Sequence, residues 1–219
     1  MSQRTKSEDL FEHACTWFKI PCRRVPEAST QTPDYQIELS DHLVIAEVKQ
    51  LDENEEDKRA WEECRKRGSA GSFPGSDSRV RRKIHAANPQ LKRLTAGQHP
   101  GVLVLYSNTS LGNYDPEDLH NAMFGSETYT IAYPRDRSSE PVFMGASLAQ
   151  DGLLAKDRNT STSAIISLRH AAAGEFSIAF YHNKFAQVPI APDWLRCNSV
   201  RHFASQDRPG KAIPFWVEV

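Results

Sequence analysis

The 219-residue chain contains no apolar run that approaches the length of a membrane span, and its polar N-terminus lacks the apolar segment of a signal peptide. Cysteine is scarce, and the four cysteines are scattered without the spacing of metal ligands. We therefore expect a cytoplasmic protein with reduced thiols, no membrane partner and no metal site built from cysteine.

Net charge is also nearly absent, because 27 Lys and Arg residues stand against 28 Asp and Glu residues. Overall charge therefore neither favours nor excludes a nucleic-acid partner. A P-loop is missing too, since no Lys-Ser/Thr pair follows the Gly- and Ser-rich segment 68–76. The chain is long enough to bury a sizeable core, as one domain with an extension or as two small domains.

What the sequence does contain is a pair of short strands that end in charged residues. Residues 34–39 alternate polar and apolar side chains, and residues 43–48 are apolar up to Glu47, so both segments are predicted as strands. Because side chains alternate along a strand, Glu47 and Lys49 are predicted to share one face. Two carboxylates, Asp34 and Glu47, beside a lysine are groups that bind a hard divalent cation and orient water or phosphate.

A two-residue turn at Ser40 and Asp41 would pair these strands so that Asp34 lies directly opposite Glu47. Opposed residues have Cβ atoms about 5 Å apart, and two like charges at that distance are unfavourable unless they share a cation. A four-residue loop would keep this register, and a loop of odd length would break it. The alternative is an exposed hairpin whose acids are solvated.

The Pro-Asp pair at 33–34 and the Glu-Val-Lys run at 47–49 resemble the signature of the PD-(D/E)xK, or restriction-endonuclease-like, nuclease superfamily. The resemblance covers about residues 7–106. It implies an α/β fold with an α-β-β-α-β core and a mixed central sheet. It also implies a metal-dependent nuclease that hydrolyses phosphodiester bonds, with DNA expected as the substrate more than RNA.

By this resemblance, Asp34, Glu47 and Lys49 are the expected catalytic residues, and Gln50 is a further candidate. The same resemblance implies that Mg²⁺ or Mn²⁺ is held by Asp34, Glu47 and the backbone carbonyl of Val48. Lys49 would then position the nucleophile and counter the charge that develops on the phosphate.

The first predicted helix has Ser7 as its N-cap and carries an apolar stripe at helical spacing. The superfamily often presents an acid from this helix to the metal site. By that resemblance, Glu12 is the expected third carboxylate, with Glu8 and Glu27 as competitors. The alternative is that Glu12 is a solvated surface residue.

Residues 52–67 hold seven acids and five bases and are predicted to form a solvated, ion-paired helix. From 78 to 114 the chain has no carboxylate, and apolar residues at helical spacing predict a helix that Pro89 kinks or divides. Six bases flank this second apolar stripe and are the expected nucleic-acid-binding residues: Arg79, Arg81, Arg82, Lys83, Lys92 and Arg93. The alternative is a solvated basic face that balances the preceding acidic run.

The rest of the chain carries no recognisable functional motif. We expect a nuclease-like core at 1–135, with a flexible charged and Gly/Ser insertion at about 52–78, and a C-terminal extension at 136–219 whose strands pack on or extend the core. Further elements are predicted as an extra first strand at 20–25, a strand at 102–106, a helix from 115 to about 125, a strand at 128–133, a small apolar element at 163–168, and strands at 176–181 and 215–219.

Two other functional classes stay open. A nuclease fold can persist as a catalytically inactive module that binds nucleic acid or a protein partner, although the intact Asp34, Glu47 and Lys49 favour an enzyme. The C-terminal part could instead make the chain a regulatory or structural partner of a larger assembly. A homodimer would explain double-strand cutting, but the sequence reveals no interface.

Overall fold

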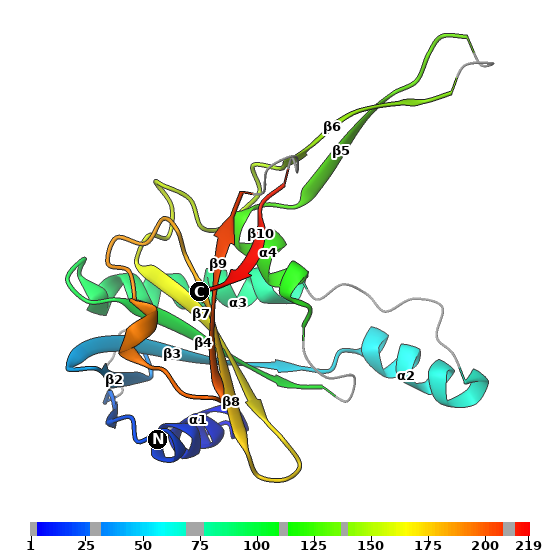
Figure 1. The fold of residues 1–219 in the computed structure, drawn as a ribbon. Coiled ribbons are helices and arrows are strands. Elements are labelled where there is room, and N and C mark those ends of the chain that lie inside the picture. Colours follow the sequence, from blue (N-terminus) through cyan, green and yellow to red (C-terminus); the bar gives the residue numbers. More distant parts are fainter. Residues whose placement is uncertain (1–3, 27–31, 69–76, 110–113, 137–139, 208–212) are drawn as a thin grey trace.

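The computed structural model describes residues 4–26, 32–68, 77–109, 114–136, 140–207 and 213–219 (Figure 1). Its helices are α1 (Lys6–Trp17), α2 (Glu55–Arg67), α3 (Asp77–Thr95), α4 (Pro116–Phe124) and a short 3-10 helix, η1 (Pro192–Trp194). Its strands are β1 (Cys22–Arg24), β2 (Tyr35–Leu39), β3 (His42–Asp52), β4 (Gly101–Asn108), β5 (Glu127–Ala132), β6 (Val142–Leu148), β7 (Thr162–His170), β8 (Phe176–His182), β9 (Val200–Gln206) and β10 (Phe215–Glu218).

Eight strands of the described chain form one sheet, in the order β1-β2-β3-β4-β7-β8-β9-β10. The neighbours β3–β4, β4–β7 and β8–β9 run parallel, and the other neighbours run antiparallel. The protein therefore has the predicted α/β class, with a large mixed central sheet. Strands β7 to β10 extend the sheet that the N-terminal strands begin, and β6 and β9 were not expected from the sequence.

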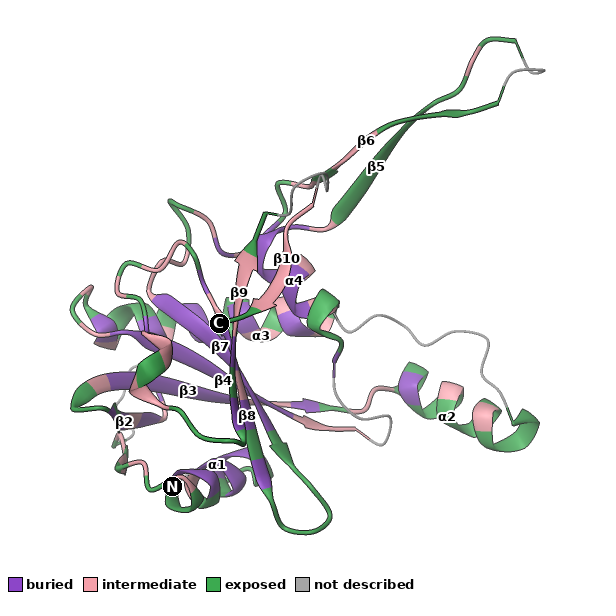
Figure 2. Cartoon of the chain, in the orientation of Figure 1, coloured by how far each residue is buried: buried purple, intermediate pink, exposed green. Residues whose placement is uncertain are grey.

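Helices cover both faces of this sheet, and its central strands are buried (Figure 1, Figure 2). Helix α1 packs on the face that receives Val44 and Val48 of β3, whereas α3 and α4 pack on the face that receives Ile45. Because side chains alternate, Glu47 and Lys49 follow Ile45 on the α3 face. No helix within the described ranges is both long and apolar enough to cross a membrane.

The turn between β2 and β3 is the predicted two-residue turn. Ser40 and Asp41 have positive φ angles of 44° and 66°, which is the conformation of the type I′ turns that close tight hairpins. Asp tolerates this left-handed region better than most residues. Leu39 pairs with His42 across the turn, so the predicted register is confirmed.

Helix α1 begins earlier than predicted, and the expected N-cap at Ser7 is wrong. The N-cap is Thr5, whose hydroxyl oxygen accepts the N–H of Glu8 at 3.3 Å while the Glu8 carboxylate accepts the N–H of Thr5 at 2.7 Å. This reciprocal capping box satisfies two helix-end donors, whereas Ser7 is buried in the first turn.

The two helices after β3 agree with the predicted pattern. Helix α2 is capped by Asn54 and ends at Gly68, whose φ of 72° suits glycine. Most of its side chains are exposed and several form ion pairs along the helix. Helix α3 runs through Pro89 without interruption, so Pro89 does not divide it into two helices. The segment 69–76, predicted as a flexible loop, lies outside the described residues.

Candidate active site

The open end of the β2–β3 hairpin places Asp34 opposite Glu47. Asp34 directly precedes β2, and the register that pairs Leu39 with His42 continues to this pair. The carbonyl of Asp34 accepts the N–H of Val25 at 2.9 Å, so its backbone bonds toward β1 and not toward β3. Opposed residues without mutual ladder bonds have the shorter Cα separation, about 4.5 Å. The two carboxyl groups therefore start from adjacent backbone positions.

The proline of the Pro-Asp pair changes the hydrogen bonding of Val48. The ladder would next pair Val48 with Pro33, which has no N–H to donate. The N–H of Val48 donates to Asp34 Oδ2 at 2.8 Å. Position 33 therefore cannot donate a ladder bond to the carbonyl of Val48, the oxygen that was expected to join the two carboxylates as a metal ligand.

Glu47 is a carboxylate in an environment that disfavours its charge. Its side chain is 0 % exposed, Oε1 pairs with Lys49 Nζ, and Oε2 has no hydrogen-bond partner among the described residues. Burial and the nearby Asp34 carboxylate raise the pKa of Glu47 to about 7, while Lys49 and the backbone N–H of Asp34 act to lower it. Burial also raises the pKa of Asp34. A cation between the two groups would favour the ionised form of both.

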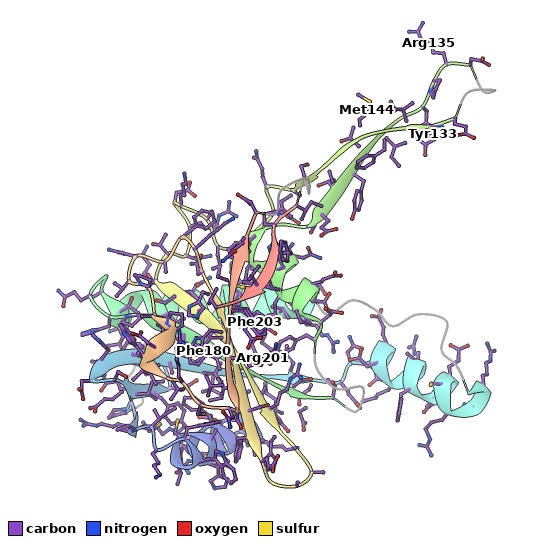
Figure 3. The ribbon with its side chains drawn as sticks, in the orientation of Figure 1. Tyr133, Arg135, Met144, Phe180, Arg201 and Phe203 are labelled. Carbon is purple, nitrogen blue, oxygen red and sulfur yellow. The ribbon has the colours of Figure 1, made fainter. Side chains whose placement is uncertain are left out.

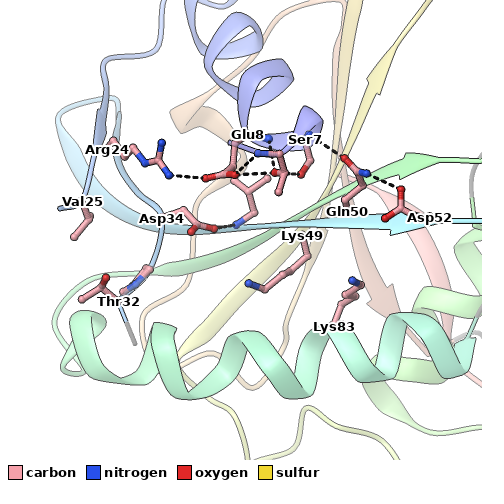
Figure 4. Close-up of a pocket in the computed structure, with 13 residues that line it drawn as sticks. Ser7, Glu8, Arg24, Val25, Thr32, Asp34, Lys49, Gln50, Asp52 and Lys83 are labelled. Atoms are coloured by element: carbon pink, nitrogen blue, oxygen red, sulfur yellow. Dashed lines mark hydrogen bonds and ion pairs between the residues drawn. The ribbon is translucent and has the colours of Figure 1, made fainter. Parts of the chain in front are cut away.

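A cavity of about 350 Å³ opens beside Asp34, between α1, the end of β3 and α3, whereas Glu47 is buried behind its wall (Figure 4). Asp34, Lys49 and Gln50 line it from the hairpin, Glu8 lines it from α1, and Lys83 lines it from α3. Three elements distant in the sequence thus contribute charged or polar groups to one space. Figure 4 shows Lys49 and Lys83 in the gap between β3 and α3.

Lys83 gives the cavity a second ammonium group. Burial lowers the pKa of Lys83, and Lys49 contributes to the lowering, while the Asp52 carboxylate acts in the opposite direction. Two neighbouring ammonium groups disfavour each other unless an anion lies between them. The α3 side of the cavity is therefore suited to a phosphate group.

The structure brings Glu8, and not Glu12, to this cavity. Glu8 accepts hydrogen bonds from Arg24 at 3.0 Å and from Thr5, and its charge contributes to the raised pKa of Asp34. Glu12 lies one turn farther along α1, where it pairs with Arg4 at 3.0 Å and accepts the hydroxyl of Tyr35 at 2.9 Å. It lines a separate cavity of about 360 Å³.

The remaining acid candidate, Glu27, lies outside the described residues. Gln50 has a defined role, because its Oε1 accepts the N–H of Ser7 at 3.1 Å and its Nε2 donates to Asp52 Oδ1 at 2.6 Å. Gln50 thus fixes the start of α1 against the end of β3. Asp52 and Arg24 also line the cavity and were not among the predicted site residues. Arg24 reaches it through Glu8, and Asp52 accepts hydrogen bonds from both Gln50 and the distant Asn108.

The six predicted nucleic-acid-binding bases separate into three groups. Arg79 pairs with Asp57, and Arg81 pairs with Asp151 at 3.1 Å, so both stabilise packing around α3. Lys83 faces the candidate site. The other three have exposed side chains: Arg82, Lys92 and Arg93. A second hollow of about 380 Å³, lined by Arg79 and Arg82, shares Asp52 and Lys83 with the first and continues the surface along α3.

Comparison with protein-family models, with curated proteins and with solved structures finds no match for this chain. Its chemistry must therefore be inferred from the site itself. Within the part of the chain that the structure describes, no three His, Cys, Asp or Glu side chains gather as a metal-binding group. The candidate metal ligands at the hairpin end include only two acidic side chains, Asp34 and Glu47, together with the backbone carbonyl of Val48.

Proposed function

We propose that this protein is a metal-dependent nuclease of the PD-(D/E)xK type that hydrolyses phosphodiester bonds in DNA. The observation that carries the proposal is the opposed Asp34–Glu47 pair, with a buried carboxylate oxygen that no described residue satisfies. Lys49 on the same face and the adjoining cavity support the same chemistry. The order α1, β2–β3, α2–α3, β4 supports a restriction-endonuclease-like core.

The donor set fits Mg²⁺ or Mn²⁺. These cations bind oxygen ligands, and Mg²⁺ in particular is commonly held by one or two carboxylates together with water and substrate phosphate. Asp34, Glu47 and the Val48 carbonyl would supply the protein oxygens. A bound metal ion would lower the pKa of a coordinated water and neutralise charge on the phosphate.

The side chains around this donor set would orient the substrate. Lys49 is 25 % exposed at its side chain, so it can contact Glu47 and a group in the cavity at the same time. Lys83 approaches from the opposite wall and would bind a second phosphate oxygen. Arg82 lies beside the adjoining hollow, where it would contact the next phosphate along the strand.

The direct test is cleavage of plasmid DNA, single-stranded DNA and RNA by the purified protein in Mg²⁺, Mn²⁺ or EDTA. We expect cleavage of DNA with either metal ion and none in EDTA. Glu47→Gln protein, purified in parallel, controls for a contaminating nuclease. Tight, salt-sensitive binding of DNA without cleavage under any metal condition would contradict the enzyme and favour a binding module.

The two glutamates of α1 give a matched pair of variants. We expect Glu8→Gln to lower cleavage about 10- to 100-fold, as is typical when a group that orients site residues is removed. Glutamine at this position keeps the capping box, so α1 should still form. Glu12→Gln should change cleavage less than about 3-fold, because Glu12 lines another cavity. Rates measured at saturating Mn²⁺ check this, and equal losses in the two variants would contradict the assignment of Glu8.

A further inference from the structure

Strands β5 and β6 form an arm that projects away from the eight-stranded sheet (Figure 1). All six residues of β5 are exposed, and β6 is exposed or half-buried throughout (Figure 2). An isolated two-stranded hairpin is at best marginally stable in water, because it has no second layer on which to pack. Any surface that packs against the arm must therefore come from outside the two-stranded β5–β6 sheet.

One face of the arm is apolar. Ile131 pairs directly with Phe143, and the rings of Tyr129 and Phe143 lie 6.4 Å apart, so these three side chains share one face. We call Tyr129, Ile131 and Phe143 the arm face. Their exposed fractions are 59, 47 and 62 %, which is unusual for large apolar side chains grouped together.

Other apolar side chains extend this surface. Tyr133 follows β5 and is 75 % exposed, and Met144 is 63 % exposed at a bulge where the pairing register shifts. Figure 3 places both on the arm with Arg135, away from the main sheet that carries Phe180 and Phe203. The bulge bends β6 locally and increases the twist of the arm there.

The charge of the arm argues against a nucleic-acid partner. Segment 127–148 contains two arginines and three acids, and β6 contains no charged residue. A phosphate backbone would find no excess of positive charge there. A second copy of this chain, by contrast, offers an uncharged apolar face of the same shape, which a two-fold axis brings into register.

We propose that two copies of this chain associate through their arms, with the arm face of one copy packed against the arm face of the other. Five large apolar residues of the arm face and its extension are 47 to 75 % exposed: Tyr129, Ile131, Tyr133, Phe143 and Met144. Together they would remove on the order of 500 Å² per copy from water, or about 1,000 Å² in all, which is the lower bound for a specific interface. The dimer would carry two candidate active sites, one per copy.

Sedimentation of metal-free protein in EDTA, from about 1 to 100 µM, tests this without any dependence on cleavage. Wild-type protein should approach twice the 24.7 kDa mass of one chain as concentration rises. Ile131→Lys and Phe143→Lys should weaken association at least ~30-fold, the effect of removing a central contact residue. Thr130→Lys, on the opposite face of the same strand, should associate as wild type does.

A wild-type protein that remains a single chain at 100 µM overturns the proposal, as does association that neither arm-face variant weakens. Dimers that persist while DNA retention falls in the same variants would assign the arm to nucleic acid instead. If a lysine variant fails to fold, replacing residues 129–146 by a short Gly-Ser link provides a second variant. This variant should melt as wild type does, since β5 is exposed along its whole length, and should remain a single chain.

Discussion

Glu47→Gln is expected to abolish metal-dependent cleavage, by about 10³-fold or more, and also to stabilise the metal-free protein above neutral pH. The first effect follows because an amide cannot supply the charge that holds a divalent cation. The second follows from burial: Glu47 is fully enclosed, one of its oxygens has no described partner, and Asp34 is close by. Glutamine has the same size and carries no charge to desolvate.

The direction of the pH dependence follows from the two pKa values of Glu47. The group titrates near 4.5 in the unfolded chain and near 7 in the folded protein. Between these values the folded state holds the proton more tightly, so stability falls as the pH rises through this range. The difference corresponds to on the order of 3 kcal/mol at pH 8. The advantage of Glu47→Gln should therefore be absent below about pH 4.5, grow toward pH 7 and stay constant above it.

Thermal denaturation in EDTA at a series of pH values measures this effect, and Mn²⁺ should raise the Tm of wild-type protein but not of Glu47→Gln. Glu38→Gln is the matched control, because Glu38 is an exposed acid of the same hairpin and should change neither cleavage nor Tm. Cleavage that survives in Glu47→Gln would place the metal site elsewhere. A Glu47→Gln protein that is less stable than wild type at pH 8 would contradict this. It would show that the contacts of the ionised Glu47 carboxylate stabilise the fold by more than its burial destabilises it.

The hairpin that carries this site could be predicted from the sequence because its determinants are local. A two-residue turn fixes which residues oppose each other, and alternation along β3 then fixes which face each side chain occupies. Ser40 and Asp41 form that turn, and the register follows to the end of the ladder. The position of Asp34 opposite Glu47 thus required no knowledge of the remaining chain.

The third acid could not be chosen in the same way. Glu8 and Glu12 lie one turn apart on α1, so helical periodicity alone places both beside the same stripe. Which one reaches the hairpin end depends on where α1 lies along the sheet. Contacts distant in the sequence decide this, above all the bond from Ser7 N–H to Gln50.

The basic residues of α3 illustrate the same limit. Their partners determine which of them remain available to a substrate, and those partners are remote: Asp57 for Arg79, and Asp151 for Arg81. Sequence composition predicted a basic helix face but not its division into packing and exposed residues. The sheet beyond β4 likewise depends on the return of β7 from far along the chain, a parallel pairing that no local pattern specifies.

Lys49→Ala is expected to lower cleavage by about 10³-fold, because removing a group that stabilises transition-state charge typically has an effect of this size. Lys49 also has an indirect role, since its charge lowers the pKa of Glu47. Without the Lys49 charge, the pKa of Glu47 should rise above 7. Protons should then compete more strongly with the metal ion for Glu47 at neutral pH. Both roles would reduce activity at pH 7.

The two roles differ in what restores activity. If Lys49 only kept Glu47 ionised, high Mn²⁺ at pH 9 would return the variant to the wild-type rate, because the higher pH removes the competing proton. If Lys49 acts on the reacting phosphate or its nucleophile, kcat stays low at every pH and metal concentration. We expect the second result, because Lys49 is partly exposed to the cavity where Lys83 also lies. Lys156→Ala, an exposed lysine outside the candidate site and the basic helix, is the control and should cleave within about 2-fold of wild type. Full rescue of Lys49→Ala would show that, within the β2–β3 hairpin, only the Asp34–Glu47 pair takes part directly in catalysis.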